Sequence, residues 1–178
     1  MFDHEYYLSN KQNTDRIAFK FYKNVINNYY YDAKNLLDYG CGTGFFLKRL
    51  SKLKNIKHLY GFDPSAYARK FAKQNSNESI IVQDISKIKN NSIDFISALH
   101  VLEHISDDEL NKVFKKFKKI ISKNGILMLA TPAKEGLAHQ IKKKKWIGFK
   151  DKTHVNLKNY KEWIDFFTNN NLKLIKAS

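Results

Sequence analysis

Three glycines at alternate positions, Gly40, Gly42 and Gly44, follow an apolar segment that ends in the acid Asp38. Glycine has no Cβ, so a chain with this spacing turns tightly and its backbone can approach a bound molecule closely. The next residues, 45–53, have the pattern of a helix, whose first N–H groups point toward whatever lies over the loop. This stretch is interpreted as a cradle for a cofactor.

Two more acids follow segments that have the character of strands. Asp63-Pro64 lies about 20 residues beyond the glycines, where an acid can accept hydrogen bonds from ribose hydroxyls. Asp84 can accept a hydrogen bond from an adenine amino group while Ile85 packs on the ring. The alternatives are that Asp63 caps the helix that begins near Ser65, and that Asp84 is a solvated loop residue.

The pattern acid-x-Gly-x-Gly-x-Gly over residues 38–44 resembles the first motif of class I S-adenosylmethionine (SAM) dependent methyltransferases. The dinucleotide fingerprint G-x-G-x-x-G is the competing interpretation, but its third glycine falls where this chain has Phe45. The run His100-Val101-Leu102-Glu103-His104 and the later Asp151-x-x-His154 resemble bacterial methyltransferases of the small-molecule type. The resemblance extends over residues 35–176.

The resemblance implies a SAM-dependent methyltransferase that acts on an oxygen or nitrogen atom of a small molecule. Gly40, Cys41 and Gly42 would line the amino-acid end of SAM. Asp63 would hold the ribose, and Leu99 with His100 would lie beneath the sulfonium. The implied cofactor-binding residues are Asp38, Gly40, Cys41, Gly42, Asp63, Pro64, Asp84, Ile85, Leu99 and His100. The alternative from another class is a catalytically idle module that binds SAM or NAD.

Histidines and a glutamate provide the candidates for acceptor chemistry. His100, Glu103 and His104 share one face if a helical turn follows the fourth strand, and His154 comes from a later loop on the same rim. Together they are candidate ligands of a divalent metal that would lower the pKa of an acceptor hydroxyl. Alternatively, His104 or His154 is a general base without metal, or Glu103 and His104 only fix the loop.

Two classes of DNA methyltransferase are excluded. Leu99-His100-Val101-Leu102 stands where the amino-methyltransferases of DNA bases carry an Asp/Asn-Pro-Pro-aromatic run. The C5-cytosine enzymes need a nucleophilic cysteine, whereas Cys41 is the only cysteine and lies in the glycine loop.

The formal net charge of +15 raises the possibility of an RNA substrate. Of the 32 basic residues, however, only Arg16, Arg49 and Arg69 are arginines, and arginine is the side chain suited to bidentate phosphate and base recognition. A small-molecule substrate is therefore favoured over the alternative, an RNA methyltransferase of the 2′-O type. The absence of a signal peptide or long apolar run, together with the single cysteine, predicts a cytoplasmic protein that does not bind membranes.

The elements that position these residues alternate between strand and helix, which predicts a three-layer, doubly wound Rossmann-like α/β sheet, mostly parallel. The C-terminal strand hairpin of the family is expected to be incomplete. A single domain, 1–178, is expected, with a helical cover at 1–34 and a substrate lid at 133–157 that contains His139, the lysine run 142–145 and Trp146. The predicted strands are 35–39, 57–62, 79–82, 93–99, 125–131 and 172–176; the predicted helices are 45–53, 65–74, 107–122 and 159–169, after an N-terminal helix with an apolar stripe at Ile17, Ala18, Phe21, Val25 and Tyr29.

Overall fold

The computed structural model describes residues 4–9, 14–29, 32–136, 140–141 and 151–177. They form two compact units, one of residues 1–99 with 116–129 and one of residues 100–115 with 130–178. The elements in chain order are α1 (His4–Ser9), α2 (Ile17–Tyr29), β1 (Asn35–Tyr39), α3 (Phe45–Leu50), β2 (His58–Phe62), α4 (Ala66–Asn75), β3 (Ile80–Val82), the 3-10 turn η1 (Ile85–Lys87), β4 (Ile93–Leu99), the 3-10 turn η2 (Leu102–His104), α5 (Asp107–Ile120), β5 (Ile121–Ala130) and α8 (Tyr160–Asn169).

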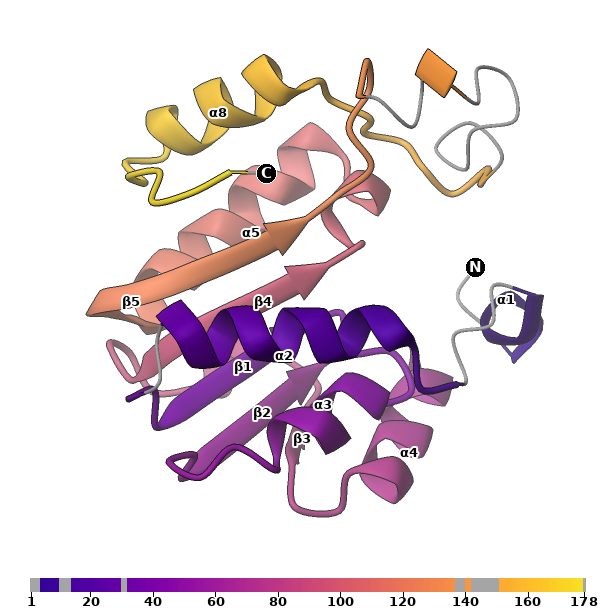
Figure 1. The fold of residues 1–178 in the computed structure, drawn as a ribbon, viewed down its shortest axis with the longest axis vertical. Coiled ribbons are helices and arrows are strands. Elements are labelled where there is room, and N and C mark those ends of the chain that lie inside the picture. Colours follow the sequence, from indigo (N-terminus) through magenta and orange to yellow (C-terminus); the bar gives the residue numbers. More distant parts are fainter. Residues whose placement is uncertain (1–3, 10–13, 30–31, 137–139, 142–150, 178) are drawn as a thin grey trace. The chain divides into compact units, whose positions relative to one another are not determined.

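The first unit contains a sheet with the strand order β3-β2-β1-β4-β5, and its arrows point the same way in Figure 1. Strand β1 pairs in parallel with both β2 and β4, so that Asp38 lies opposite Gly61 on one side and Ser97 on the other. From β1 the chain winds outward to β3, then returns to the far side of β1 as β4. The strand order therefore reverses between β1 and β4, which is where doubly wound sheets bind ligands. The predicted fold class is confirmed.

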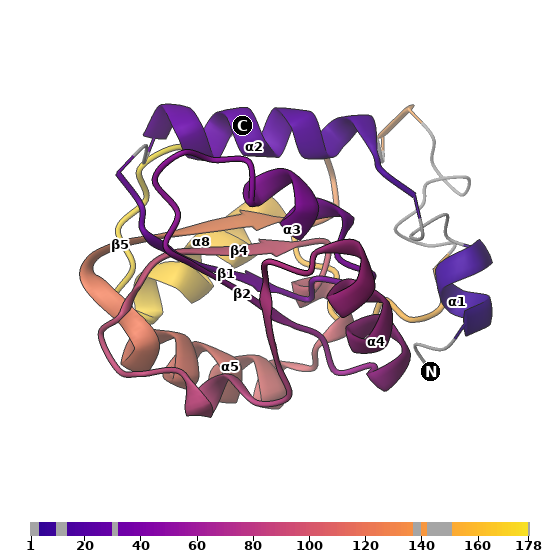
Figure 2. The ribbon, with the colours of Figure 1, turned by 90° about the horizontal axis from the view of Figure 1, so that it is seen from below.

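Side chains alternate between the two faces of this sheet, as the pleat requires. Leu36, Leu59 and Phe95 share one face and pack in a core that also contains residues of α2, α3 and α4. On the opposite face Tyr39 stacks on Phe62 and meets Phe117 of α5 edge to face. Figure 2, which looks along the sheet, shows α2 on one side of it and the C-terminal end of α5, which belongs to this unit, on the other.

The N-terminal helix was predicted correctly, but its buried face was not. Residues Ile17 and Phe21 of the expected stripe are 90% and 62% exposed. Instead Ile26 is buried, and Phe19 and Tyr22 pack against the core, with Phe46 contacting both rings. Because α2 contains apolar residues on more than one side, periodicity alone did not identify the face that meets the sheet.

Two further predictions about strands need correction. Helix α5 ends at Ile120 and β5 begins at Ile121, four residues before the predicted start, because Asn124-Gly125 lies within the strand instead of ending the helix. A Cβ on Gly125 would lie 3.0 Å from the carbonyl oxygen of Ile93, so the glycine permits a close approach of β4. The expected strand at 172–176 is not formed, and these residues have no regular secondary structure.

In the second unit an aromatic cluster holds α8 against Phe114, in the part of α5 that belongs to this unit. Phe114 meets Phe166 edge to face at 4.9 Å between ring centroids, and Trp163 stacks on Phe167 at 5.5 Å. A reciprocal capping box between Asn159 and Glu162 begins α8. Of the predicted lid, Lys134 bridges to Asn159, whereas His139, the lysine run 142–145 and Trp146 lie outside the described residues.

Candidate functional site

The glycine loop has the conformation that its composition predicts. Gly40, Gly42 and Gly44 all have positive φ, at 77°, 53° and 85°. The N–H groups of Gly40 and Cys41 both donate to the carbonyl of Phe62, which ties the loop to the end of β2. A Cβ on Gly44 would lie 2.7 Å from the Cα of Ala72. The third glycine therefore allows α3 and α4 to pack closely.

Asp63 holds several segments together at the end of β2. Its Oδ2 accepts a hydrogen bond from the N–H of Gly42 at 2.9 Å, and its Oδ1 accepts from the N–H of Ser65 at 2.9 Å. The Tyr7 hydroxyl also donates to Oδ1, at 3.1 Å. The helix cap itself is Ser65, whose side chain accepts from the N–H of Ala68. Asp63 is 5% exposed, and burial raises the pKa of its carboxyl although these donors oppose the shift.

Asp38, the acid before the glycines, is fully inside the unit. Its Oδ1 accepts a hydrogen bond from the Ser97 hydroxyl at 2.7 Å. Burial is the main cause that raises the pKa of Asp38 to about 7, and the nearby charge of Asp63 adds to it. The sequence did not single out Ser97, which lies within an apolar strand and shows its role only through the register of β1 with β4.

The remaining predicted cofactor residues differ in the solvent exposure of their side chains. Asp84 caps η1 through Ser86 and pairs with Lys116; these donors hold the pKa of its carboxyl well below its usual range. Ile85 is 2% exposed, and the Cys41 side chain lies in the core at 6% exposure. The Cys41 thiol is therefore enclosed by the core. Pro64 is exposed and Leu99 is half-buried.

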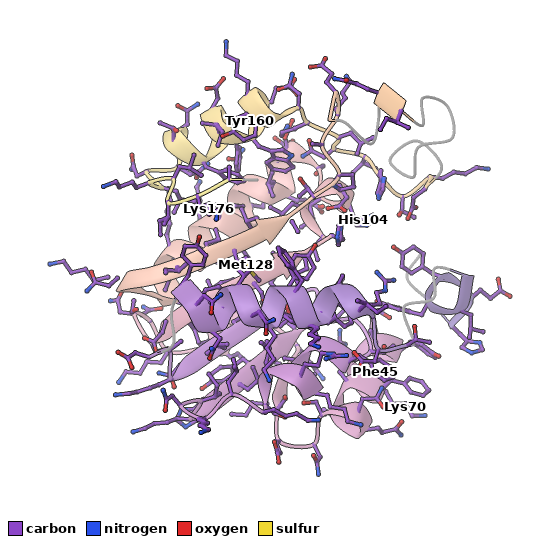
Figure 3. All side chains as sticks on the ribbon, viewed as in Figure 1. Phe45, Lys70, His104, Met128, Tyr160 and Lys176 are labelled. Atoms are coloured by element: carbon purple, nitrogen blue, oxygen red, sulfur yellow. The ribbon has the colours of Figure 1, made fainter. Side chains whose placement is uncertain are left out.

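The second unit brings Glu103, His104 and His154 together. One possible ligand atom from each of the three lies within 4.8 Å of the others. The loop that carries His154 is anchored because the N–H groups of Val155 and Asn156 both donate to the Glu103 carbonyl. The two imidazole rings are 4.7 Å apart between centroids. Figure 3 labels His104 in the turn that follows β4.

Glu103 is the unusual member of this group. It is 1% exposed, and within the described part of the chain neither of its carboxylate oxygens receives a hydrogen bond. The Nδ1 atom of His100 is 3.6 Å from Oε1, beyond hydrogen-bonding distance. A buried carboxylate without such partners is costly, and retained examples call for an explanation such as a catalytic role or an ion.

A polar chain orients His104. Its Nδ1 lies 2.8 Å from the Thr153 hydroxyl, which in turn contacts Asp151 at 2.6 Å. Burial lowers the pKa of His104, although the charge of Glu103 opposes this. Burial also raises the pKa of Asp151, but the hydrogen bonds from Thr153 and the charges of the two histidines lower it on balance. His104 is therefore largely neutral at pH 7.

His100 lies at the edge of this group, with its Nδ1 at ion-pair distance from Glu103 when the imidazole is protonated. Its side chain is exposed, and its backbone has a φ of 57°, with the N–H donating to the carbonyl of Ala130. The sequence missed Thr153 and Tyr7. Thr153 lies between two residues of the motif Asp151-x-x-His154, whereas no local pattern marks Tyr7.

Comparison with known proteins gives consistent matches. A family model described as a methyltransferase domain matches residues 2–177. An uncharacterized methyltransferase from Bacillus cereus (strain 03BB102) is 30% identical over 99 residues, which are 54% of this chain and 46% of the relative. One from Geobacillus thermodenitrificans is 28% identical over 123 residues, covering 65% and 56%. The chain thus spans about half the length of the curated relatives it matches.

Solved structures share the fold. A SAM-dependent methyltransferase from Archaeoglobus fulgidus superposes with a TM-score of 0.73 at 18% identity, over 98% of this chain and 76% of that one. A putative type 11 methyltransferase from Sulfolobus solfataricus gives 0.66 at 24% identity, over 88% and 82%. At these identities the likeness establishes the fold alone. Within the described ranges, no helix is long and apolar enough to cross a membrane.

Proposed function

Because this chain belongs to the methyltransferase domain family, we propose that it transfers a methyl group from SAM to an oxygen or nitrogen atom of a small molecule. SAM brings the electrophile itself, a methyl group on a positively charged sulfur. What the protein contributes is binding, orientation and the handling of one proton. The cluster of buried Glu103 with half-buried His104 and His154 is the observation that carries the acceptor half of this proposal.

The first unit would bind the cofactor. The left-handed glycines would let the amino-acid end of SAM approach the backbone of the loop closely. Because the N–H groups of residues 40–42 are bonded to Phe62 and Asp63, carbonyl groups of the loop would make these contacts. Asp63 would accept from the ribose, because one lone pair of its Oδ2 remains after the bond from Gly42. Asp84, Ile85, Pro64 and Leu99 stay proposed contacts of the adenosine.

His104 would accept the proton that leaves the acceptor atom. A general base works best when its neutral form predominates at the working pH, and burial holds the pKa of His104 below the ordinary histidine value. With Nδ1 engaged by Thr153, we assign the receipt of the proton to Nε2. His154, beside it, is the alternative base.

A divalent cation is the second way in which this cluster would act. One carboxylate and two imidazoles form a donor set suited to zinc, manganese or iron, more than to magnesium, which prefers oxygen. The two carboxylate oxygens of Glu103 that lack donors fit such an ion. Glu103, His104 and His154 would hold it, and the ion would lower the pKa of an acceptor hydroxyl.

Calorimetric titration tests the cofactor half. Purified protein is titrated with SAM and, in parallel, with NAD. Micromolar affinity for SAM without binding of NAD supports the proposal, whereas folded protein that binds neither contradicts it. Titration with Mn²⁺ and Zn²⁺, repeated with Glu103→Gln, then separates a cation site from a metal-free base, since only a cation site loses heat of binding in the variant.

Turnover tests the acceptor half. Release of S-adenosylhomocysteine is followed with panels of small phenols, amines and carboxylic acids, and with RNA as the competing substrate class. His104→Gln should lower turnover about a hundredfold or more while SAM binding is unchanged. His58→Gln is the matched control, because His58 is an exposed histidine at the start of β2, where its Nδ1 contacts the Asn35 side chain and its ring lies near Tyr60.

A further inference from the structure

Tyr7 on α1 contacts Asp63, the acid that we propose binds the ribose. The residue is 3% exposed although it lies near the start of the chain, and its hydroxyl donates to Asp63 Oδ1 at 3.1 Å. Its ring stacks on Tyr67 of α4 at 5.7 Å between centroids, with an angle of 24° between the planes. Tyr67 in turn contacts Phe71 at 4.6 Å. Two rings of α4 therefore support the placement of this hydroxyl.

The hydrogen bond from Tyr7 occupies one of the acceptor positions of the Asp63 carboxylate. A carboxylate offers about four acceptor positions, two on each oxygen. Tyr7 and Ser65 fill those of Oδ1, and Gly42 takes one of Oδ2. The remaining position is on Oδ2, the oxygen that is bound to the glycine loop. The bond from Tyr7 thus leaves one acceptor position, and it lies on the side of the cradle.

We propose that Tyr7 is a positioning residue of the cofactor site, whose hydroxyl holds Asp63 in the orientation and ionised state that a ribose hydroxyl requires. This inference rests on the proposed binding of SAM at the glycine loop. It makes α1 a part of the cofactor site, and not only a cover over the sheet. The ligand class is a nucleoside whose ribose carries free hydroxyls.

The hydrogen bond from Tyr7 is one of the interactions that set the pKa of Asp63. Asp63 interacts electrostatically with the acid Asp38 on β1 and with the thiol of Cys41. Arg69 of α4 provides the nearby positive charge. Burial raises the pKa of Asp63, whereas the bonds from Ser65, Gly42 and Tyr7 lower it. Burial and Asp63 itself raise the pKa of Tyr7 well above its usual value, so that Tyr7 stays a donor. Loss of its hydroxyl should therefore raise the pKa of Asp63 further.

The test measures the affinity for SAM of four proteins: wild type, Tyr7→Phe, Asp63→Asn and the double variant. Phenylalanine keeps the ring that stacks on Tyr67 and removes only the donor. We expect Tyr7→Phe to weaken SAM binding about five- to tenfold. In the Asp63→Asn background the same change should have almost no further effect, because the two residues act through one bond. Tyr60→Phe, a half-buried tyrosine earlier in β2, is the matched control.

A second readout is the pH dependence of SAM affinity. A higher pKa of Asp63 means that the carboxylate is protonated at a higher pH, so that the loss of affinity on acidification should begin earlier in Tyr7→Phe than in wild type. Thermal unfolding of each variant separates a folding defect from a change of the site. Equal or tighter binding by Tyr7→Phe, or full additivity with Asp63→Asn, would overturn the inference. Wild-type protein that binds no SAM would instead contradict the proposed function.

Discussion

The Ser97 hydroxyl donates a hydrogen bond of 2.7 Å to Asp38 Oδ1 between two strands in which these residues are direct register partners. Both residues are buried, at 1% and 3% exposure. The acid that precedes the glycine loop is therefore held by a neutral donor in an apolar sheet. Burial in this setting raises the pKa of Asp38 to about 7, so that its charge changes within the physiological range.

Replacement of Asp38 by asparagine should change how stability depends on pH. The folded-state pKa of about 7 is higher than that of the unfolded chain, so the contribution of Asp38 is fully present below about pH 4 and is lost as the pH rises through 7. Between pH 4 and pH 8, Asp38→Asn should gain on the order of 2–4 kcal/mol relative to wild type. Urea unfolding at both pH values measures this. A constant difference between the two proteins would contradict it.

Gly44→Ala should destabilise the first unit. The new Cβ would lie 2.7 Å from the backbone of Ala72, and a residue with a Cβ is strained at a φ of 85°. Crowding and strain together should cost about 2–4 kcal/mol of unfolding free energy. The midpoint of urea unfolding would fall, with no change expected in its slope. An unchanged midpoint would mean that α3 and α4 can separate at little cost.

The rate of methyl transfer should depend on pH through His104. Its pKa is lowered, mainly by burial, so the neutral form is already dominant at pH 7 and kcat should stay level from there upward. A fall is expected only on acidification below about pH 6.5, the ordinary histidine pKa. In His104→Gln, kcat should drop about a hundredfold or more. A full rate in that variant would assign the proton transfer to another group.

Glu103→Gln should separate stability from activity. Burial of a charged carboxylate without donors is unfavourable, so the neutral amide is expected to give an unfolding free energy equal to that of wild type or about 1–3 kcal/mol higher. Turnover, and any response to added divalent cations, should fall in the same variant. Glu109→Gln, an exposed glutamate on α5, provides the comparison. A marked loss of stability in Glu103→Gln would show that the carboxylate has a structural role.

The elements with a single clear signal were predictable from the sequence. Strand β1 and strand β4 have the predicted bounds because each is a mostly apolar segment bounded by polar or glycine residues. Helix α5 has one apolar stripe, and its members Leu110, Phe114 and Phe117 are buried as expected. The glycine loop followed from composition alone, since three glycines at this spacing admit the positive φ values that the structure has.

Other features depend on partners that the local sequence does not reveal. The start of β5 was misplaced because Asn124-Gly125 has the composition of a helix stop, whereas the glycine serves the contact with β4. The role of Tyr7 arises from an acid 56 positions away, and that of Ser97 from register. The residues 172–176 have the composition of a strand, but no strand forms there. Such roles are fixed by tertiary contacts and not by propensity.

Each of the two units is made of two separate segments of the chain, which limits how the protein can be divided into fragments. The backbone passes from one unit to the other after Leu99, after Lys115 and after Leu129, and α5 contributes residues to both. No single cut in the polypeptide would release either unit whole, and deletion of residues after Leu99 would remove β5 from the sheet. The contributions of the glycine loop and of the histidine cluster must therefore be separated by point substitutions in the intact chain, not by fragments.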